Sequence, residues 1–247
     1  MTLKEILDKA RELRIKGQIQ ESFKLIQHEC IKQPNYKHLL FQHQPLFWNS
    51  MSAGICVLTR RNASDAEFMR QLWRNNEFKY RFHRHAPDLP KSDGILRLKL
   101  QSEFTSLVSE SRAIHWLIRD QKNTPYGILS IVDISMMHKK SEVLLGVLPI
   151  APIGLSVASM LILFQFFFNL LKMNKLYVIV FSDNLHALKG VLHLGFKIEG
   201  KFKNELLDPK SNQFVDVTRL AIDRENAFSA SNIRLMNKLL KAKSNER

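Results

Sequence analysis

The longest stretch of the sequence without a charged side chain, residues 143–171, restricts the fold more than any other feature. Its length alone would allow a membrane span. However, Pro149, Pro152 and Gly154 interrupt its first half, and several polar residues occur in its second half. We therefore expect a buried strand, a turn and a buried helix over residues 155–171, and no association with a membrane.

From residue 53 onward, short apolar runs alternate with turns and amphipathic segments, which is typical of a mixed α/β domain. The chain has 45% apolar and 24% charged residues, as expected for a folded globular protein. We expect strands over residues 54–59, 113–119, 126–136, 142–148, 176–181, 196–203 and 214–222. We expect helices over residues 64–75, 102–110, 155–171 and 184–194. The predicted fold class is α/β, in a domain that spans residues 53–223.

Residues 1–44 precede this domain and place apolar side chains at helical spacing, with a break at Gly17 and an end at Pro34. This pattern predicts a helical hairpin and resembles a single tetratricopeptide repeat, with Ser22 where a small alanine is usual. One repeat cannot bury its own apolar face. We expect it to dock on the following domain, on a second copy of the chain in a homodimer, or on a partner protein.

Two further segments complete the predicted organisation. Residues 45–52 form a connector, and residues 224–247 form an amphipathic, lysine-rich helical tail. The formal net charge of +14 favours an anionic partner. No nucleic-acid-binding motif accompanies this charge, so a phosphorylated cofactor, a nucleotide-linked substrate or simply a solvated basic surface would account for it.

Cysteine and histidine usage argues against a metal site and a disulfide framework. The two cysteines, Cys30 and Cys56, are not arranged as a zinc motif. His83 and His85 would supply two metal ligands without a third. We expect no metal and a reducing, cytoplasmic environment.

The turn at residues 149–154 leads directly into the N-terminus of the long apolar helix. The first backbone N–H groups of a helix lack acceptors and lie at the positive end of its dipole, so such a turn can bind a phosphate. Any crossover from a strand to a helix can contain glycine and proline. The turn alone is therefore compatible with an anion site and with a purely structural role.

The segment after this helix carries a more specific pattern. A strand is followed by Asn-x-x-Ala, a helix, Gly-Phe and a strand that ends in Glu-Gly. These positions are filled by Asn184, Ala187, Gly195, Phe196, Glu199 and Gly200. Upstream, Trp73-Arg74-Asn75 ends the first predicted helix of the domain, and Glu142 opens its fourth strand. These motifs resemble the GNAT superfamily of N-acetyltransferases, in particular its ribosomal-protein and amino-sugar N-acetyltransferase branch.

The resemblance covers residues 53–223 and implies a mixed seven-stranded sheet, flanked by helices, whose fourth and fifth strands splay apart. It implies acetyl-CoA as the acetyl donor, with the pantetheine arm in the gap between those strands. The residues implied to bind coenzyme A are Val147, Leu148, Gly154, Leu155, Ser156, Val157, Ala158 and Asn184. The amides of residues 154–158 would hold the pyrophosphate.

Three residues are implied in or beside the chemistry. The backbone N–H of Leu148 would stabilise the oxyanion of the thioester. Asn184 would bind the pantetheine arm or an ordered water, or it would simply cap the following helix. Glu142 would act as the base, because an acceptor ammonium must lose a proton before it can attack.

Alternatives exist for the base. Glu142 could instead be an ordinary turn carboxylate that faces Lys139 or Lys140. His115 and His138 are further candidates, although a histidine in a strand is more often a half-buried polar side chain.

Three positions differ from the family pattern. In the turn, Ala151 stands where arginine or glutamine is usual, and Ser156 replaces a glycine. Val191 stands where many members carry a tyrosine that protonates the departing thiolate. Water or another side chain would then protonate the thiolate, or the domain would bind an acyl donor without efficient turnover. The alternative of another class is a non-catalytic adaptor in which a degenerate GNAT domain and the hairpin bind a partner protein.

The acceptor is expected to be a small-molecule amine. Arg74, Asn75, Arg81 and Arg84 follow the first predicted helix, where the superfamily commonly builds its acceptor wall, and their charge suits a phosphate-bearing substrate. We therefore expect a nucleotide-linked amino sugar, with a protein N-terminus or lysine as the alternative acceptor. A polyamine is less favoured, because a cationic groove would repel it.

Overall fold

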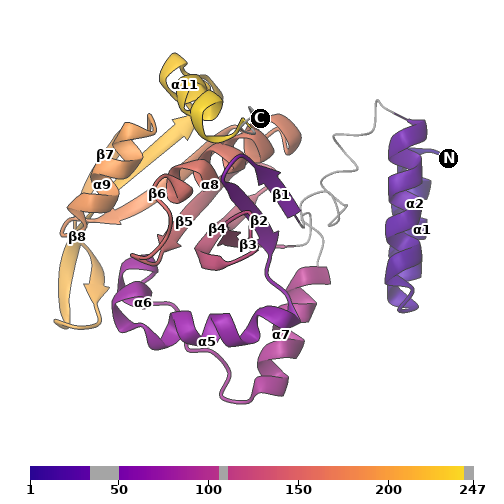
Figure 1. Cartoon of the computed structure of the whole chain (residues 1–247), viewed down its shortest axis with the longest axis horizontal. Coiled ribbons are helices and arrows are strands. Elements are labelled where there is room, and N and C mark those ends of the chain that lie inside the picture. The colour runs from indigo at the N-terminus through magenta and orange to yellow at the C-terminus, as the bar shows by residue number, and fades with distance from the viewer. Residues whose placement is uncertain (34–49, 106–110, 242–247) are drawn as a thin grey trace, which may run out of the picture.

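The computed structural model describes residues 1–33, 50–105 and 111–241 (Figure 1). Helices α1 (Leu3–Ile15) and α2 (Ile19–Lys32) form the predicted N-terminal hairpin. Apolar side chains of the two helices pack together in a separate buried cluster, formed by Ile6, Ala10 and Ile26. The resemblance to a tetratricopeptide repeat and the docking of the hairpin stay predictions.

The core of the domain is an eight-stranded mixed sheet with the order β1-β2-β3-β4-β5-β6-β8-β7. The strands are β1 (Ser50–Ala53), β2 (Cys56–Arg60), β3 (Ala113–Arg119), β4 (Pro125–Ser135), β5 (Lys140–Val147), β6 (Lys175–Phe181), β7 (Lys197–Asp208) and β8 (Gln213–Asp223). The predicted number of seven is wrong because of β1, which pairs with β2 and takes three of its four residues from the segment assigned to the connector. Residues 45–49 of that connector lie outside the described residues.

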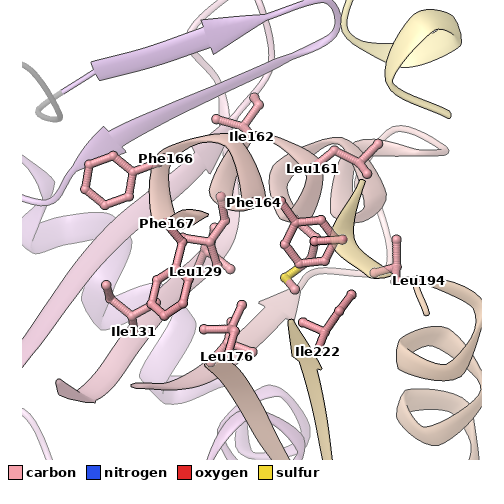
Figure 2. Packing of buried hydrophobic residues seen from close by; sticks show 14 of the residues in the cluster. Leu129, Ile131, Leu161, Ile162, Phe164, Phe166, Phe167, Leu176, Leu194 and Ile222 are labelled. Carbon is pink, nitrogen blue, oxygen red and sulfur yellow. The ribbon is translucent and has the colours of Figure 1, made fainter. Parts of the chain in front are cut away.

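One face of the sheet is covered by the apolar helix that the sequence predicted. Helix α8 (Leu155–Phe164) continues as a π-helical segment, Gln165–Leu170, and both belong to the main hydrophobic core. Figure 2 shows Phe164 and Phe167 of this helix packed among side chains of the sheet. Helices α9 (Leu185–His193) and α11 (Ala230–Leu239) contribute to the same core, and the short helix α10 (Arg224–Ala227) precedes α11. The uncharged stretch is therefore a strand, a turn and a buried helix.

The opposite face carries a second core built by three helices. These are α5 (Ala66–Arg74), α6 (Asn76–Phe82) and α7 (Asp93–Thr105), and a short 3-10 turn, Ala63–Asp65, precedes α5. The predicted helix at residues 102–110 is displaced toward the N-terminus, and residues 106–110 lie outside the described residues. Within the described ranges, no helix is both long enough and apolar enough to cross a membrane.

Candidate active site

Strands β5 and β6 are the only parallel neighbours among the strands described, and they separate after a few residues. Their register contains three pairs, Lys140 with Lys175, Ser141 with Leu176, and Glu142 with Tyr177. Beyond Glu142 and Tyr177, both strands continue without pairing to each other, to Val147 and Phe181. The splayed strands that the sequence analysis predicted are confirmed. We call the opening between them the β5–β6 gap.

Glu142 lies at the closed end of the β5–β6 gap. Its neighbours Ser141 and Val143 are buried on the face covered by α8, so the alternation along a strand directs Glu142 to the face covered by α5 and α6. Burial raises the pKa of Glu142 to about 7; the negative charge of Asp133 adds to the rise, and the positive charge of Arg219 opposes it. No ion pair joins Glu142 to Lys139 or Lys140 in the described part of the chain. A carboxylate with this pKa can accept a proton near neutral pH.

Asp133 and Arg219 complete the charged surroundings of Glu142. Asp133 lies in β4 at an irregularity of the β4–β5 register, and its backbone adopts the left-handed conformation, with φ of +49°. Arg219 of β8 places its guanidinium carbon 4.4 Å from the centre of the Tyr177 ring. No local pattern in the sequence marks Asp133, Tyr177 or Arg219 as a site residue, because only the register of the sheet brings them to Glu142.

The turn before α8 presents unbonded amides, as the sequence analysis expected of a phosphate site. Gly154 is the N-cap of α8, with φ of +86°. The N–H of Leu155 donates to Pro152 and that of Ala158 to Gly154. Among the described residues, the amides of Gly154, Ser156 and Val157 make no hydrogen bond to the protein. Of the five predicted amides, these three are available to an anion.

The backbone of β5 decides which amides face the β5–β6 gap. The N–H of Leu148 donates to the carbonyl of Tyr126 in β4, with 2.7 Å between nitrogen and oxygen. Amide directions alternate along an antiparallel ladder. The amides of Leu145 and Val147 therefore face away from β4, toward the gap. The N–H of Leu148 is bonded to β4 and does not point into the gap, so it does not fit the expected oxyanion role. The N–H of Val147 does point into the gap.

Asn184 is the N-cap of α9. Its side-chain oxygen accepts a hydrogen bond from the N–H of Ala187 at 3.2 Å, which is the capping alternative of the sequence analysis. A role in binding pantetheine stays a prediction. Val191, on the same helix, packs against the main core.

The two histidines named as alternative bases lie in different surroundings. His115 is hydrogen-bonded to Ser130, with 2.8 Å between Nδ1 and Oγ. Burial and the charges of Arg61, Arg60 and Lys99 hold its pKa well below the usual value. His138 is exposed on the turn after β4. Glu142, at the closed end of the β5–β6 gap, stays the predicted base.

The residues expected to bind a phosphate-bearing acceptor are mostly engaged within the protein. Asn75 caps α6 by accepting from Phe78, and Arg81 pairs with Glu77. The side chain of Arg84 is 5% exposed and pairs with Asp183 and Asp208. Arg74 is exposed. The predicted cationic wall is therefore largely neutralised.

No family model matches the chain. Individual proteins of known activity are nevertheless similar to it. A spermidine N(1)-acetyltransferase of Escherichia coli strain K12 is 23% identical over 149 residues, which cover 56% of this chain and 79% of the relative.

Solved structures with the same fold include a spermidine N-acetyltransferase from Vibrio cholerae in complex with CoA and spermine. Its TM-score is 0.59 at 18% identity, over 70% of this chain and 97% of that one. A dodecameric structure of spermidine N-acetyltransferase from Vibrio cholerae aligns with a TM-score of 0.57 at 19% identity, over 70% and 96% of the two chains. The chain therefore has the GNAT fold of the N-acetyltransferases, as the motifs around Asn184 and Gly195 predicted.

Proposed function

We propose that this protein is an N-acetyltransferase that transfers the acetyl group of acetyl-CoA to a primary amine of a polyamine. The observation that carries the proposal is the β5–β6 gap, which has a carboxylate of near-neutral pKa, Glu142, at its closed end. The names of the similar proteins support the acetyl donor and the class of acceptor.

The residues around the β5–β6 gap fit coenzyme A. The available amides of Gly154, Ser156 and Val157 lie at the helix N-terminus where a pyrophosphate would be held. The gap-facing amides of Leu145 and Val147 would pair with the pantetheine arm and polarise the thioester carbonyl. Acetyl-CoA supplies an activated acetyl group, so the protein needs to orient the two substrates and to move protons.

Glu142 would remove the proton that keeps the acceptor amine from attacking. At neutral pH a free alkylamine is an ammonium ion without a lone pair. Transfer of one proton to Glu142, directly or through water, yields the neutral amine. The amine nitrogen then attacks the thioester carbon, the carbon–sulfur bond breaks, and the second nitrogen proton is lost as the amide forms.

The charges near the closed end favour a cationic acceptor. Glu142 and Asp133 are close enough for the charge of Asp133 to raise the pKa of Glu142. A polyamine carries several positive charges along a flexible chain, so it can place one amine at Glu142 and another near Asp133. A nucleotide-linked sugar was expected because arginines were thought to be available for its phosphates. Arg84 is not available, because Asp183 and Asp208 neutralise its charge.

The test is an acetylation assay with the full-length purified chain. Acetyl-CoA is incubated with spermidine, spermine, a UDP-linked amino sugar or a peptide with a free N-terminus, and products are identified by mass spectrometry. We expect acetylation of spermidine or spermine, and strong loss of it in Glu142→Gln. Binding of coenzyme A is measured separately by thermal shift, where a ligand at 100 times its dissociation constant adds about 2.7 kcal/mol of stability. Acetylation of the peptide but of neither polyamine would refute the proposed acceptor, and absence of coenzyme A binding would refute the function itself.

A further inference from the structure

Tyr177 of β6 lies opposite Glu142 in the sheet. It is in register with Glu142 at the last pair before β5 and β6 separate. Residues paired across two strands point to the same face of the sheet. The Tyr177 side chain therefore lies beside Glu142, on the face covered by α5 and α6, at the closed end of the β5–β6 gap.

The hydroxyl of Tyr177 is available to a ligand. Within the described ranges no hydrogen bond joins this hydroxyl to the protein, and the oxygen is not sealed from solvent. The other two tyrosines described both use their hydroxyls, Tyr80 with Asp208 and Tyr126 with Asp120. The guanidinium of Arg219 stacks on the Tyr177 ring and restricts its orientation.

Acetyl transfer also requires a group that donates a proton. When the tetrahedral intermediate collapses, the carbon–sulfur bond breaks and coenzyme A departs as a thiolate, which must gain a proton to become the free thiol. Val191 of α9 has an aliphatic side chain that packs against the main core. It cannot donate a proton.

We propose that Tyr177 is the catalytic acid that protonates the departing thiolate of coenzyme A. The proposal rests on the function proposed above. The proton passes from the Tyr177 hydroxyl to sulfur as the carbon–sulfur bond breaks. The resulting tyrosinate is reprotonated by Glu142, which holds a proton taken from the acceptor amine. Over a full cycle one acceptor ammonium and acetyl-CoA yield the acetamide, free coenzyme A and one proton released to solvent.

The charges that face Tyr177 come from several strands. Burial raises the pKa of Tyr177, the carboxylates of Glu142 on β5 and Asp133 on β4 add to the rise, and Arg219 on β8 opposes it. Lys175 on β6 and Glu199 on β7 form a neighbouring ion pair. The phenol therefore stays protonated at neutral pH, which a proton donor requires.

The experiment uses the full-length chain and compares Tyr177→Phe with the matched variant Tyr126→Phe. In the wild type, the hydroxyl of Tyr126 donates to Asp120 on the β3–β4 turn. We expect Tyr177→Phe to lower kcat about 10²- to 10⁴-fold. Its dissociation constant for coenzyme A, measured by calorimetry, should stay within threefold of the wild type. Tyr126→Phe should retain its kcat. An unchanged kcat in Tyr177→Phe, with active wild type, would overturn the proposal while leaving the acetyltransferase function intact.

A second measurement separates acid catalysis from a structural role. Incorporation of 3-fluorotyrosine or 3,5-difluorotyrosine at position 177 lowers the pKa of the phenol without changing its shape appreciably. We expect the alkaline limb of the kcat profile, measured at saturating acceptor, to move to lower pH with each added fluorine. The pKa of the acceptor amine is the same in all three proteins and cannot produce this shift. A limb that does not move would exclude proton donation by Tyr177.

Discussion

Gly146 of β5 lies directly beneath the ring of Phe78 in α6. A β-carbon added at Gly146 would lie 2.9 Å from Cε2 of Phe78 and 2.9 Å from Cδ2 of Phe82. The two rings stack on each other, with 5.7 Å between their centres. Because Gly146 borders the β5–β6 gap, its missing side chain allows α6 to pack closely on the strand that also carries Glu142.

Gly146→Ala is predicted to destabilise the protein by about 1–3 kcal/mol, because the added methyl group forces the two rings apart. Chemical denaturation measures the change. Gly94→Ala is the control, since a β-carbon there meets only Ser92 Oγ at 3.7 Å. Adding Phe78→Leu to Gly146→Ala should restore part of the lost stability. Equal effects of Gly146→Ala and Gly94→Ala would contradict the close packing of α6.

Glu142 is predicted to set the acidic limb of the activity profile. Its pKa of about 7 means that the proportion of Glu142 able to accept a proton falls as the pH drops below 7. We expect kcat/KM for the acceptor to decrease on that side, and Glu142→Gln to reduce it by about 10²- to 10⁴-fold. A residual rate in Glu142→Gln that still falls with the same apparent pKa would assign the limb to another group.

The same residue is predicted to lower stability at alkaline pH. The pKa of Glu142 in the folded protein lies above the ordinary value of 4.5, so the folded state binds more protons than the unfolded state between about pH 4.5 and 7. Stability therefore falls as the pH rises through this window. Glu142→Gln should be more stable than the wild type at pH 8, by on the order of 1–3 kcal/mol, and should lose this advantage at pH 4. Denaturation curves at both values provide the measurement.

The fold was predictable from the sequence to a greater extent than the site. The motifs around Asn184 and Gly195 specified the GNAT fold, and the turn at Gly154 specified where β5 ends and α8 begins. Strand β1 was missed because it has only four residues, Ser50–Ala53, and gains its order by pairing with β2. Helix α6 was missed because it spans only Asn76–Phe82 and is fixed by the cap at Asn75 and by packing on Gly146.

The positions of the site residues depend on the register of the strands, which cannot be read from the sequence. A shift of one residue along β5 reverses the direction of each amide, so the sequence could not decide between Leu148 and Val147 as a donor into the gap. Tyr177 was missed for a similar reason. Tyr177 pairs with Glu142 between two parallel strands that are separated in sequence by the whole of α8. No local pattern in the sequence fixes the register of such strands.

The charge of Asp208 is predicted to stabilise the protein down to acidic pH. Burial alone would raise its pKa, but hydrogen bonds from Ser211 and Tyr80 and the charge of Arg84 lower it to about 2. A carboxylate whose pKa is lowered by folding contributes stability above its unfolded pKa of about 4 and loses it as the pH falls toward 2. We expect Asp208→Asn to reduce the unfolding temperature at pH 7 and to match the wild type near pH 2. An equal loss at both values would point to packing rather than charge.

Gly154→Ala is predicted to weaken coenzyme A binding and to destabilise the fold. Gly154 adopts φ of +86°, a region that residues with a side chain rarely occupy, and an added β-carbon would lie 3.3 Å from Cδ2 of Leu239 in α11. The residue would have to move and would take the neighbouring amides of Ser156 and Val157 with it. We expect a loss of roughly 1 kcal/mol or more in stability and a higher dissociation constant for coenzyme A.

Gly190→Ala provides the matched control for this prediction. Gly190 lies inside α9, its φ is not positive, and nothing lies within 4 Å of an added β-carbon. Alanine in a helix interior is favoured over glycine, so this variant should gain roughly 0.5–1 kcal/mol and keep its affinity for coenzyme A. Calorimetric titration of both variants gives the comparison. If Gly154→Ala binds coenzyme A as tightly as Gly190→Ala does, the amides at the start of α8 are not what holds the pyrophosphate.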